Sequence, residues 1–154
     1  MEASDSRLGI ALAALEPLLV DGEHVLLGYE RGSAPPSPDA LAAESFAARV
    51  DDPFETTFVV RTTLADTMPP PAARVGPLKA IVLSGALPPD LTGFMSVIAG
   101  ALAERGIPIV PIGAATRDHL LVPVRDWPEA LAILRGLRDS ARILLEPPGA
   151  EPLA

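Results

Sequence analysis

Residues 107–124, IPIVPIGAATRDHLLVPV, contain two short apolar runs that are separated by a small connection. Residues 107–113 and 118–124 are rich in Ile, Val and Leu, and each has the length of a buried strand. Residues 114–117, Ala-Ala-Thr-Arg, form a short connection between them. The stretch therefore predicts two neighbouring strands, around which the second half of the chain is arranged.

A strand and a helix are predicted upstream of this pair. Residues 78–85, LKAIVLSG, have the composition of a strand. We expect a helix to start at residues 88–90, Pro-Pro-Asp, and to end at Gly106. Its apolar side chains recur at helical spacing and would cover one face of a sheet. They are Leu91, Phe94, Ile98 and Leu102.

A second helix and a last strand are predicted downstream. Asp126 is the N-cap of the helix, Glu129 completes a capping box, and Pro128 falls in the first turn. Residues 141–146, ARILLE, are predicted to form the last strand. The order is strand, helix, strand, strand, helix, strand, which is the ferredoxin-like α+β pattern. In that pattern the helices cover one face of a four-stranded antiparallel sheet.

The first half of the chain predicts one helix and three strands. The helix carries leucines at helical spacing and ends at Pro17. These leucines are Leu8, Leu12 and Leu15. The predicted strands are residues 23–30, 44–50 and 55–62, and residues 44–50 and 55–62 could pair as a hairpin.

A proline-rich segment suggests how the chain is divided. Residues 68–77, MPPPAARVGP, are predicted to be a linker because they cannot continue a helix or a strand. We therefore expect one unit over residues 1–75, a second over residues 76–146 and a tail over residues 147–154.

Composition excludes several classes of function. The formal net charge is −8, and the Lys and Arg residues are scattered singly, so no basic stripe is available for nucleic acid or an anionic membrane. The chain has no cysteine, which excludes disulfides and thiolate chemistry. In the first 20 residues, acids precede an apolar run that Glu16-Pro17 interrupts. This run lacks the layout of a signal peptide and is too short to span a bilayer, so we expect a cytoplasmic protein.

Catalytic and metal-binding motifs are absent from the sequence. The two histidines, His24 and His119, are far apart, and Asp118 and His119 would point to opposite faces of a strand. Ser84 could be combined with His119 and an acid on paper, but no nucleophile elbow surrounds it. No glycine pattern for a nucleotide occurs either. We expect neither an enzyme, nor a metal site, nor a cofactor.

The loop before the first helix of the second half is a candidate binding site. A helix that starts near Asp90 presents free backbone N–H groups that suit a carboxylate, and Gly93 would let a ligand approach the backbone. The alternative is that Asp90 is only an N-cap and Gly93 only a packing position. Asp118 could hold an ammonium or guanidinium group. Its alternative role is that of a solvated strand end.

These residues resemble a known family. The segments DLTGFMSVIAGALAERGIPI and RDHLLVPVRDWPEALAILRGL, within residues 78–138, are similar to ACT domains of the CASTOR and DUF2241 branch. The first half is similar in layout to the degenerate first ACT-like unit of that branch. Relatives usually carry an acidic pair followed by Gly between the hairpin strands of that unit. This chain has DDPFE at residues 51–55, without glycine, so no ligand contact of the first half is carried over.

The resemblance implies tandem ACT-like units and a regulatory role. ACT domains typically bind an amino acid where two such units meet, and occupancy changes the activity or assembly of a partner. The implied partners are therefore an amino acid, a second copy of the chain in a homodimer, and a regulated enzyme or regulator. The alternative is a ligand-free interaction module. The residues that match the binding features are Asp90, Leu91, Thr92, Gly93 and Asp118, with Gly113 and Ala114 beside them.

Overall fold

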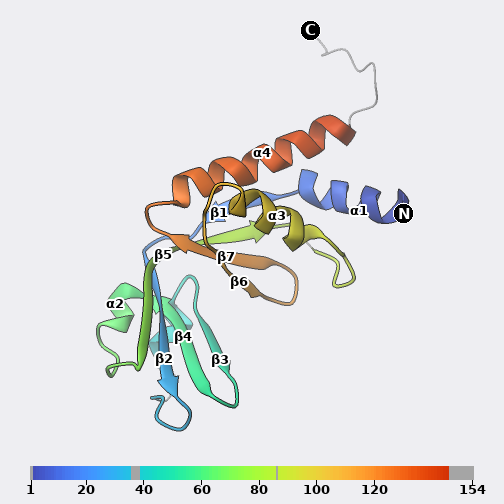
Figure 1. Cartoon of the computed structure of the whole chain (residues 1–154). Coiled ribbons are helices and arrows are strands. Elements are labelled where there is room, and N and C mark those ends of the chain that lie inside the picture. The colour runs from blue at the N-terminus through green and yellow to red at the C-terminus, as the bar shows by residue number, and fades with distance from the viewer. Residues whose placement is uncertain (1, 36–38, 86, 146–154) are drawn as a thin grey trace.

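One long strand, β5 (Ala73–Ser84), runs through both lobes of the molecule (Figure 1). The computed structural model describes residues 2–35, 39–85 and 87–145. The first part of β5 pairs with β2 (His24–Glu30), and its second part pairs with β1 (Glu16–Leu19) and β7 (Asp118–Pro123). The strand thereby joins a lobe made mainly of strands, the strand lobe, to a lobe that carries the main helices, the helical lobe.

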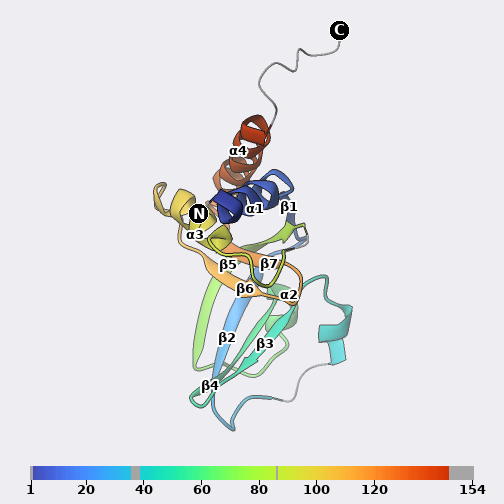
Figure 2. The ribbon, with the colours of Figure 1, turned by 90° about the vertical axis from the view of Figure 1, so that its right-hand side faces the viewer.

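The helical lobe contains a sheet with the order β1-β5-β7-β6, in which β6 is Val110–Gly113. All of its pairs are antiparallel, with Ile81 opposite Leu120 in the β5–β7 pair. Three helices cover one face of this sheet (Figures 1 and 2). They are α1 (Glu2–Ala13), α3 (Phe94–Ala103) and α4 (Trp127–Leu145). The predicted stripe of α3 forms part of the core, since Phe94, Ile98 and Leu102 are buried.

The fourth strand of this lobe comes from the other end of the chain. Residues 141–146 were predicted to form it, and that prediction is wrong because α4 continues to Leu145. The position beside β5 is taken by β1, in which Leu19 lies opposite Ile81. Ala141 is buried on the same helical face as Leu134, so the apolar spacing of α4 continues through the predicted strand. Arg142 also donates to the carbonyl oxygen of Ala13 at 2.8 Å, which joins the helix to the chain just before β1.

Two other predicted boundaries are also corrected. The helix α3 begins at Phe94 rather than at residues 88–90, because Gly93 is its N-cap with φ of 86°. The predicted linker at residues 68–77 is wrong in its second part, since residues 73–77 belong to β5. The register between β2 and β5 is irregular between the pairs Leu26–Val75 and His24–Leu78. Pro77 lies in this irregularity, where a missing N–H group is tolerated.

The strand lobe has the order β5-β2-β4-β3. The remaining elements of this lobe, given in chain order, are η1 (Asp39–Ala43), β3 (Ala48–Asp51), β4 (Glu55–Arg61) and α2 (Thr62–Ala65). The pair β3–β4 is the predicted hairpin, with Val50 opposite Thr57. The strand β5 runs across residue 75, and the division of the chain into units at that residue stays a prediction.

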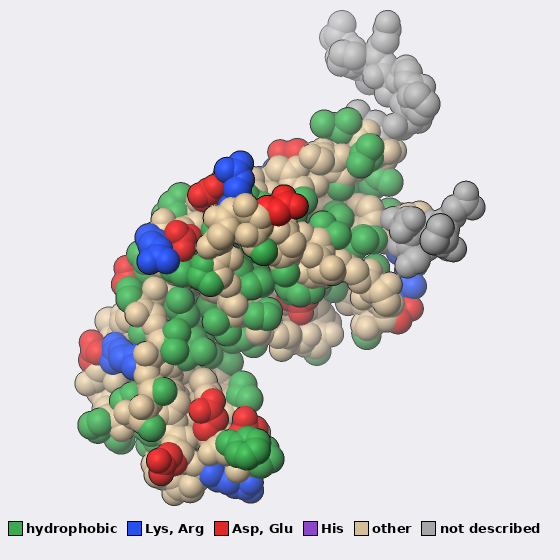
Figure 3. All heavy atoms as spheres, in the orientation of Figure 1, with side chains coloured by type: hydrophobic (Ala, Val, Ile, Leu, Met, Phe, Trp, Pro, Cys, Tyr) green, Lys and Arg blue, Asp and Glu red, His purple; other side chains and the backbone are tan. Residues whose placement is uncertain are grey.

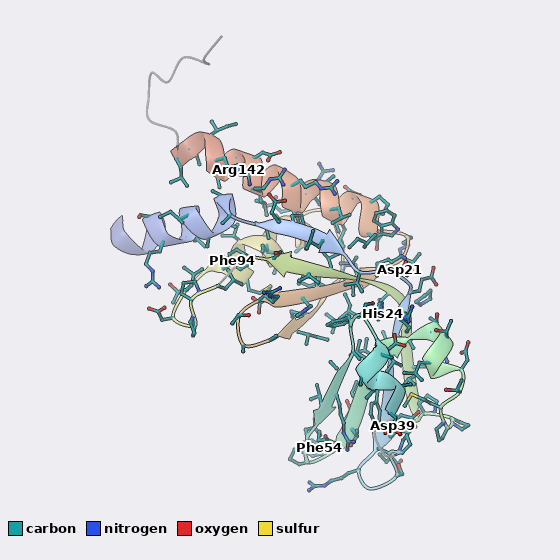
Figure 4. The ribbon with its side chains drawn as sticks, turned by 180° about the vertical axis from the view of Figure 1, so that it is seen from behind. Asp21, His24, Asp39, Phe54, Phe94 and Arg142 are labelled. Carbon is teal, nitrogen blue, oxygen red and sulfur yellow. The ribbon has the colours of Figure 1, made fainter. Side chains whose placement is uncertain are left out.

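An apolar cluster joins the two lobes. Phe46 and Val59 of the strand lobe pack in one cluster with Ala80 and Leu121 of the helical lobe. In Figure 4 the labelled His24 lies where the lobes meet. Because the cluster and β5 are shared, the position of one lobe depends on side chains of the other. No helix of the described residues is long and apolar enough to cross a membrane.

Candidate functional site

A pocket opens beside the start of α3, at the end of the β6–β7 hairpin. Its volume is about 350 Å³. One wall is the loop that leads into α3 together with the first turn of that helix, and the other is the loop between β6 and β7. We call it the loop pocket. It is lined by Leu87, Pro88, Pro89, Leu91, Gly93, Phe94, Met95, Ser96, Ala114, Ala115, Thr116, Arg117 and Asp118.

Backbone hydrogen bonds hold the two walls together. The N–H group of Leu87 donates to the carbonyl oxygen of Thr116 at 3.2 Å, which ties one loop to the other. The N–H group of Ala114 donates to the carbonyl oxygen of Arg117 at 3.0 Å and closes the hairpin. The N–H group of Leu91 donates to the carbonyl oxygen of Pro88 at 3.0 Å. The pocket is therefore shaped by backbone as much as by side chains.

The first turn of α3 provides the donors of the pocket. The N–H group of Val97 bonds to the carbonyl oxygen of Gly93 at 3.0 Å, so the helical hydrogen bonds begin there. The N–H groups of Phe94, Met95 and Ser96 precede this bond, and all three residues line the pocket. Together with the positive end of the helix dipole, they form an environment that favours a carboxylate. A Cβ at Gly93 would lie 3.3 Å from a methyl carbon of Leu8, and the positive φ also favours glycine.

Asp118 supplies the acid of the pocket. It is the first residue of β7, it is half-buried, and it lies opposite Gly113 in the β6–β7 pair. A Cβ at Gly113 would lie 3.6 Å from a carboxylate oxygen of Asp118, so the absence of a side chain leaves room beside the acid. The neighbouring Arg117 also lines the pocket. A carboxylate and a helix N-terminus thus border one pocket, which suits a ligand that carries both charges.

The structure brings together four of the seven predicted binding residues. Those that line the loop pocket are Leu91, Gly93, Ala114 and Asp118. Gly113 lies beside Asp118 and lines a second pocket, between the lobes. Thr92 is exposed in the loop before α3 and is not among the lining residues.

Asp90 forms an ion pair with Arg7, whereas it was predicted to bind the ligand or to be the N-cap of the helix. Its carboxylate accepts hydrogen bonds from both terminal nitrogens of Arg7, at 2.8 and 3.0 Å, and the pair is exposed. The hydrogen bond from Arg7 lowers the pKa of Asp90, and the same bond raises the pKa of Arg7. Asp90 is also not the N-cap of α3, since Gly93 occupies that position. The residue therefore joins α1 to the loop of the pocket.

Sequence reasoning missed several lining residues. Met95 and Ser96 face the pocket from the first turn of α3, and Thr116 and Arg117 face it from the hairpin loop. The later start of the helix explains the first two, because a helix starting at residue 90 would place other residues in its first turn. Thr116 and Arg117 were treated only as a connection between strands.

The two histidines lie at the lobe junction. The ring of His119 stacks on that of Phe46, with centroids 4.8 Å apart and an interplanar angle of 27°. His24 meets the same phenyl ring edge-on, with centroids 5.7 Å apart. A second pocket of about 420 Å³, the junction pocket, is lined by Phe46 and His119 together with residues of both lobes. Among the described residues, no group of three or more His, Cys, Asp or Glu side chains could hold a metal ion.

Comparisons with known proteins agree with this architecture. Residues 76–136 match the ACT_7 family model, which is described as an ACT domain. A Vibrio cholerae protein of unknown function has a similar structure, with a TM-score of 0.67 and 23% identity, over 88% of this chain and 98% of that one. An Agrobacterium tumefaciens protein is similar with a TM-score of 0.67 and 18% identity, over 80% of this chain and 89% of that one.

A regulatory subunit has the same fold. The regulatory subunit of aspartate kinase from Thermus flavus is similar with a TM-score of 0.58 and 15% identity, over 80% of this chain and 98% of that one. No curated protein matches the sequence. The predicted α+β class, with antiparallel strands and helices, is confirmed. Residues 76–136 therefore match an ACT domain, and the likeness of the whole chain to the solved structures is one of fold alone.

Proposed function

We propose that this chain is a non-catalytic regulatory protein that binds an amino acid or a related small metabolite in the loop pocket. The observation that supports it best is the shared border of the pocket, where Asp118 and the first turn of α3 meet. The N–H groups of Phe94, Met95 and Ser96 would bind the α-carboxylate. Asp118 would bind the ammonium or another cationic group of the ligand.

The charges of the pocket favour a zwitterion over a simple anion or cation. A helix N-terminus stabilises negative charge, and the effect falls off within the first turn. The carboxylate of Asp118 stabilises positive charge at the other wall. An amino acid carries both charges on groups that are bonded to the same carbon atom, so a single small ligand could meet both walls of the pocket.

The wider role rests on the family. In the proposed arrangement the chain is a homodimer, in which a second unit meets the loop pocket and ligand occupancy changes a regulated enzyme or regulator. The likeness to an aspartate kinase regulatory subunit supports this only at the level of the fold. On the face shown in Figure 3, acidic and basic side chains are interspersed, which does not favour a phosphate backbone as partner.

Thermal shift with each common L-amino acid at millimolar concentration tests the proposal. One or a few amino acids are expected to raise the melting temperature, because a ligand that binds only the folded state stabilises it. Asp118→Asn is expected to abolish that shift while the protein stays folded. The matched control is Asp66→Asn, which changes an exposed acid of the strand lobe outside the pocket.

The result that would overturn the proposal is a complete absence of shift in protein that is folded and free of carried-over ligand. An unchanged affinity in Asp118→Asn would remove this acid from the site. In that case the cationic group must be bound elsewhere.

The second candidate function is a ligand-free interaction module. Among the described strands β1 pairs with β5 alone and forms an edge of the helical lobe, and Leu18 and Leu19 on it are exposed. Edge strands with exposed apolar side chains readily pair with another chain. Mass measurement in solution with and without amino acids separates the two functions: a constant dimer that binds no amino acid supports the module.

A further inference from the structure

Two neighbouring residues of β7 face different parts of the molecule. Asp118 lines the loop pocket, and His119 lines the junction pocket. Successive side chains of a strand point to opposite faces of the sheet, so one short strand borders both pockets. Ala114, at the other end of the hairpin connection, lines both pockets as well. A displacement of this end of β7 would therefore change both.

The ring of His119 contacts the strand lobe by packing. Its Nδ1 atom is buried and has no hydrogen-bond partner among the described residues. The contact of its ring is the stack on Phe46, at 4.8 Å between centroids. Because Nδ1 gives this half-buried ring no polar anchor, the position of the ring depends on the phenyl ring that it stacks on.

Phe46 belongs to the strand lobe and is itself fixed there. Its side chain is buried, and its second ring neighbour is His24. Two residues earlier, Glu44 accepts a hydrogen bond from the Nε of Arg61 at 2.5 Å, and the side chain of Glu44 is only 8% exposed. Arg61 ends β4, so this ion pair anchors the segment before β3 to the sheet. Phe46 does not line the loop pocket.

We propose that Phe46 is a positioning residue for the loop pocket and acts through His119. The strand lobe thereby holds the end of β7 in place, and with it Asp118 and the loop of residues 114–117. Any change in the packing of the lobes is transmitted to the pocket across a single strand. The value of this arrangement for regulation rests on the proposed function, whereas the mechanical link is independent of any ligand.

Hydrogen exchange in the ligand-free protein tests the link. The N–H groups of Leu87 and Ala114 make the two hydrogen bonds that depend on the hairpin loop, and NMR can follow each of them. In Phe46→Leu, which removes the ring stack and keeps an apolar side chain, their exchange is expected to be about two- to tenfold faster. Exchange at Val97, whose N–H group bonds within α3, is expected to stay at the wild-type rate.

Three further variants complete the experiment. Phe46→Tyr restores a ring and is expected to restore the wild-type exchange at Leu87 and Ala114. Phe58→Leu removes a fully buried ring elsewhere in the strand lobe and is expected to leave these two amides unchanged. If Phe46→Leu does not fold, His119→Leu breaks the same stack from the other side and carries the same expectation.

Unchanged exchange at Leu87 and Ala114 in a folded variant without the stack would overturn the inference. An equal acceleration in Phe58→Leu would also overturn it, because the effect would then be general loosening. Since no ligand is added, this result is independent of whether an amino acid binds, and the failure of one proposal is distinguishable from the failure of the other.

Discussion

His24 is a fully buried polar residue at the lobe junction. Neither of its ring nitrogens has a hydrogen-bond partner of ordinary geometry among the described residues. Burial lowers the pKa of this imidazole from its ordinary value of 6.5, and the carboxylate of Glu44 opposes the effect. The cations of Arg61 and Lys79 disfavour a proton on the ring as well. The folded protein therefore favours the neutral form of His24.

This burial predicts that acidification weakens the fold. As the pH falls through 6.5, the unfolded chain binds a proton that the folded chain disfavours, so the free energy of unfolding decreases. The contribution is fully present above this pH and is lost below it. Urea denaturation at a series of values between about pH 7.5 and pH 5 measures the decrease.

The control for this prediction is His24→Leu, which should show a flatter dependence over the same range. The carboxylates with lowered pKa do not interfere, since the ordinary value for an aspartate is 3.8 and their effect appears at lower pH. If the variant loses as much stability as the wild type between these pH values, another group causes the dependence.

At the scale of elements, the strand β1 completes the sheet of the helical lobe. It takes the fourth strand position beside β5, and the chain just before it carries a side chain of the core, Leu15, which is 1% exposed. Arg138 and Arg142 of α4 also form ion pairs with Glu16, at 2.9 and 3.0 Å. These pairs are at the surface, so apolar burial is the larger contribution.

Two leucine substitutions test the role of this segment. Leu15→Ala is expected to lower the free energy of unfolding by about 2–5 kcal/mol, because it leaves a cavity in a packed core. Leu18→Ala, in a side chain that is 55% exposed, is expected to change it by less than about 0.5 kcal/mol. Urea denaturation of both variants measures the difference, and equal losses would mean that Leu15 does not contribute to the core as described.

At the scale of the whole molecule, the lobes share a strand and an apolar cluster. β5 lies in one continuous sheet that extends through both lobes, and side chains such as Phe46 and Leu121 pack in one cluster across the junction. The segment that matches the family, residues 76–136, contains neither β1 nor the first part of β5. Its sheet is complete only when residues near the N-terminus pair with it.

A fragment tests this dependence. A chain of residues 76–146 is expected to show no cooperative urea transition, because it lacks β1 and the helix α1 that packs beside α4 (Figures 1 and 2). In the complete chain, circular dichroism and the fluorescence of Trp127 are expected to report one common transition.

A permuted chain is the control for the fragment. In Figure 1 the end of α4 and the start of α1 lie on the same side of the molecule, so a flexible linker could join them. Residues 76–145, a linker and residues 2–22 should then regain a cooperative transition. If the fragment alone unfolds cooperatively, the second unit is independent of β1.

Local patterns in the sequence predicted most of the elements, and several of the predicted binding residues lie at the loop pocket. The strands around residues 78–85 and 118–124 and the buried stripe of α3 follow from apolar spacing, which is a property of neighbouring residues. Gly93, Ala114 and Asp118 were assigned to one site from the family resemblance and from the chemistry of a helix start. The structure places these three beside one pocket.

Long-range contacts decided the rest. Residues 141–146 have an apolar run that suits a strand or a helix, and the contacts of α4 with the segment near Ala13 and Glu16 favour the helix. Asp90 pairs with Arg7, which is 83 positions away, so no local pattern reveals it. The stack of Phe46 on His119 likewise joins two lobes. Sequence alone determined which segments can be helices, strands and binding loops, because those choices depend on near neighbours. The tertiary structure determined which segments share a sheet and which side chains shape the pocket, because those choices depend on partners that are distant in the chain.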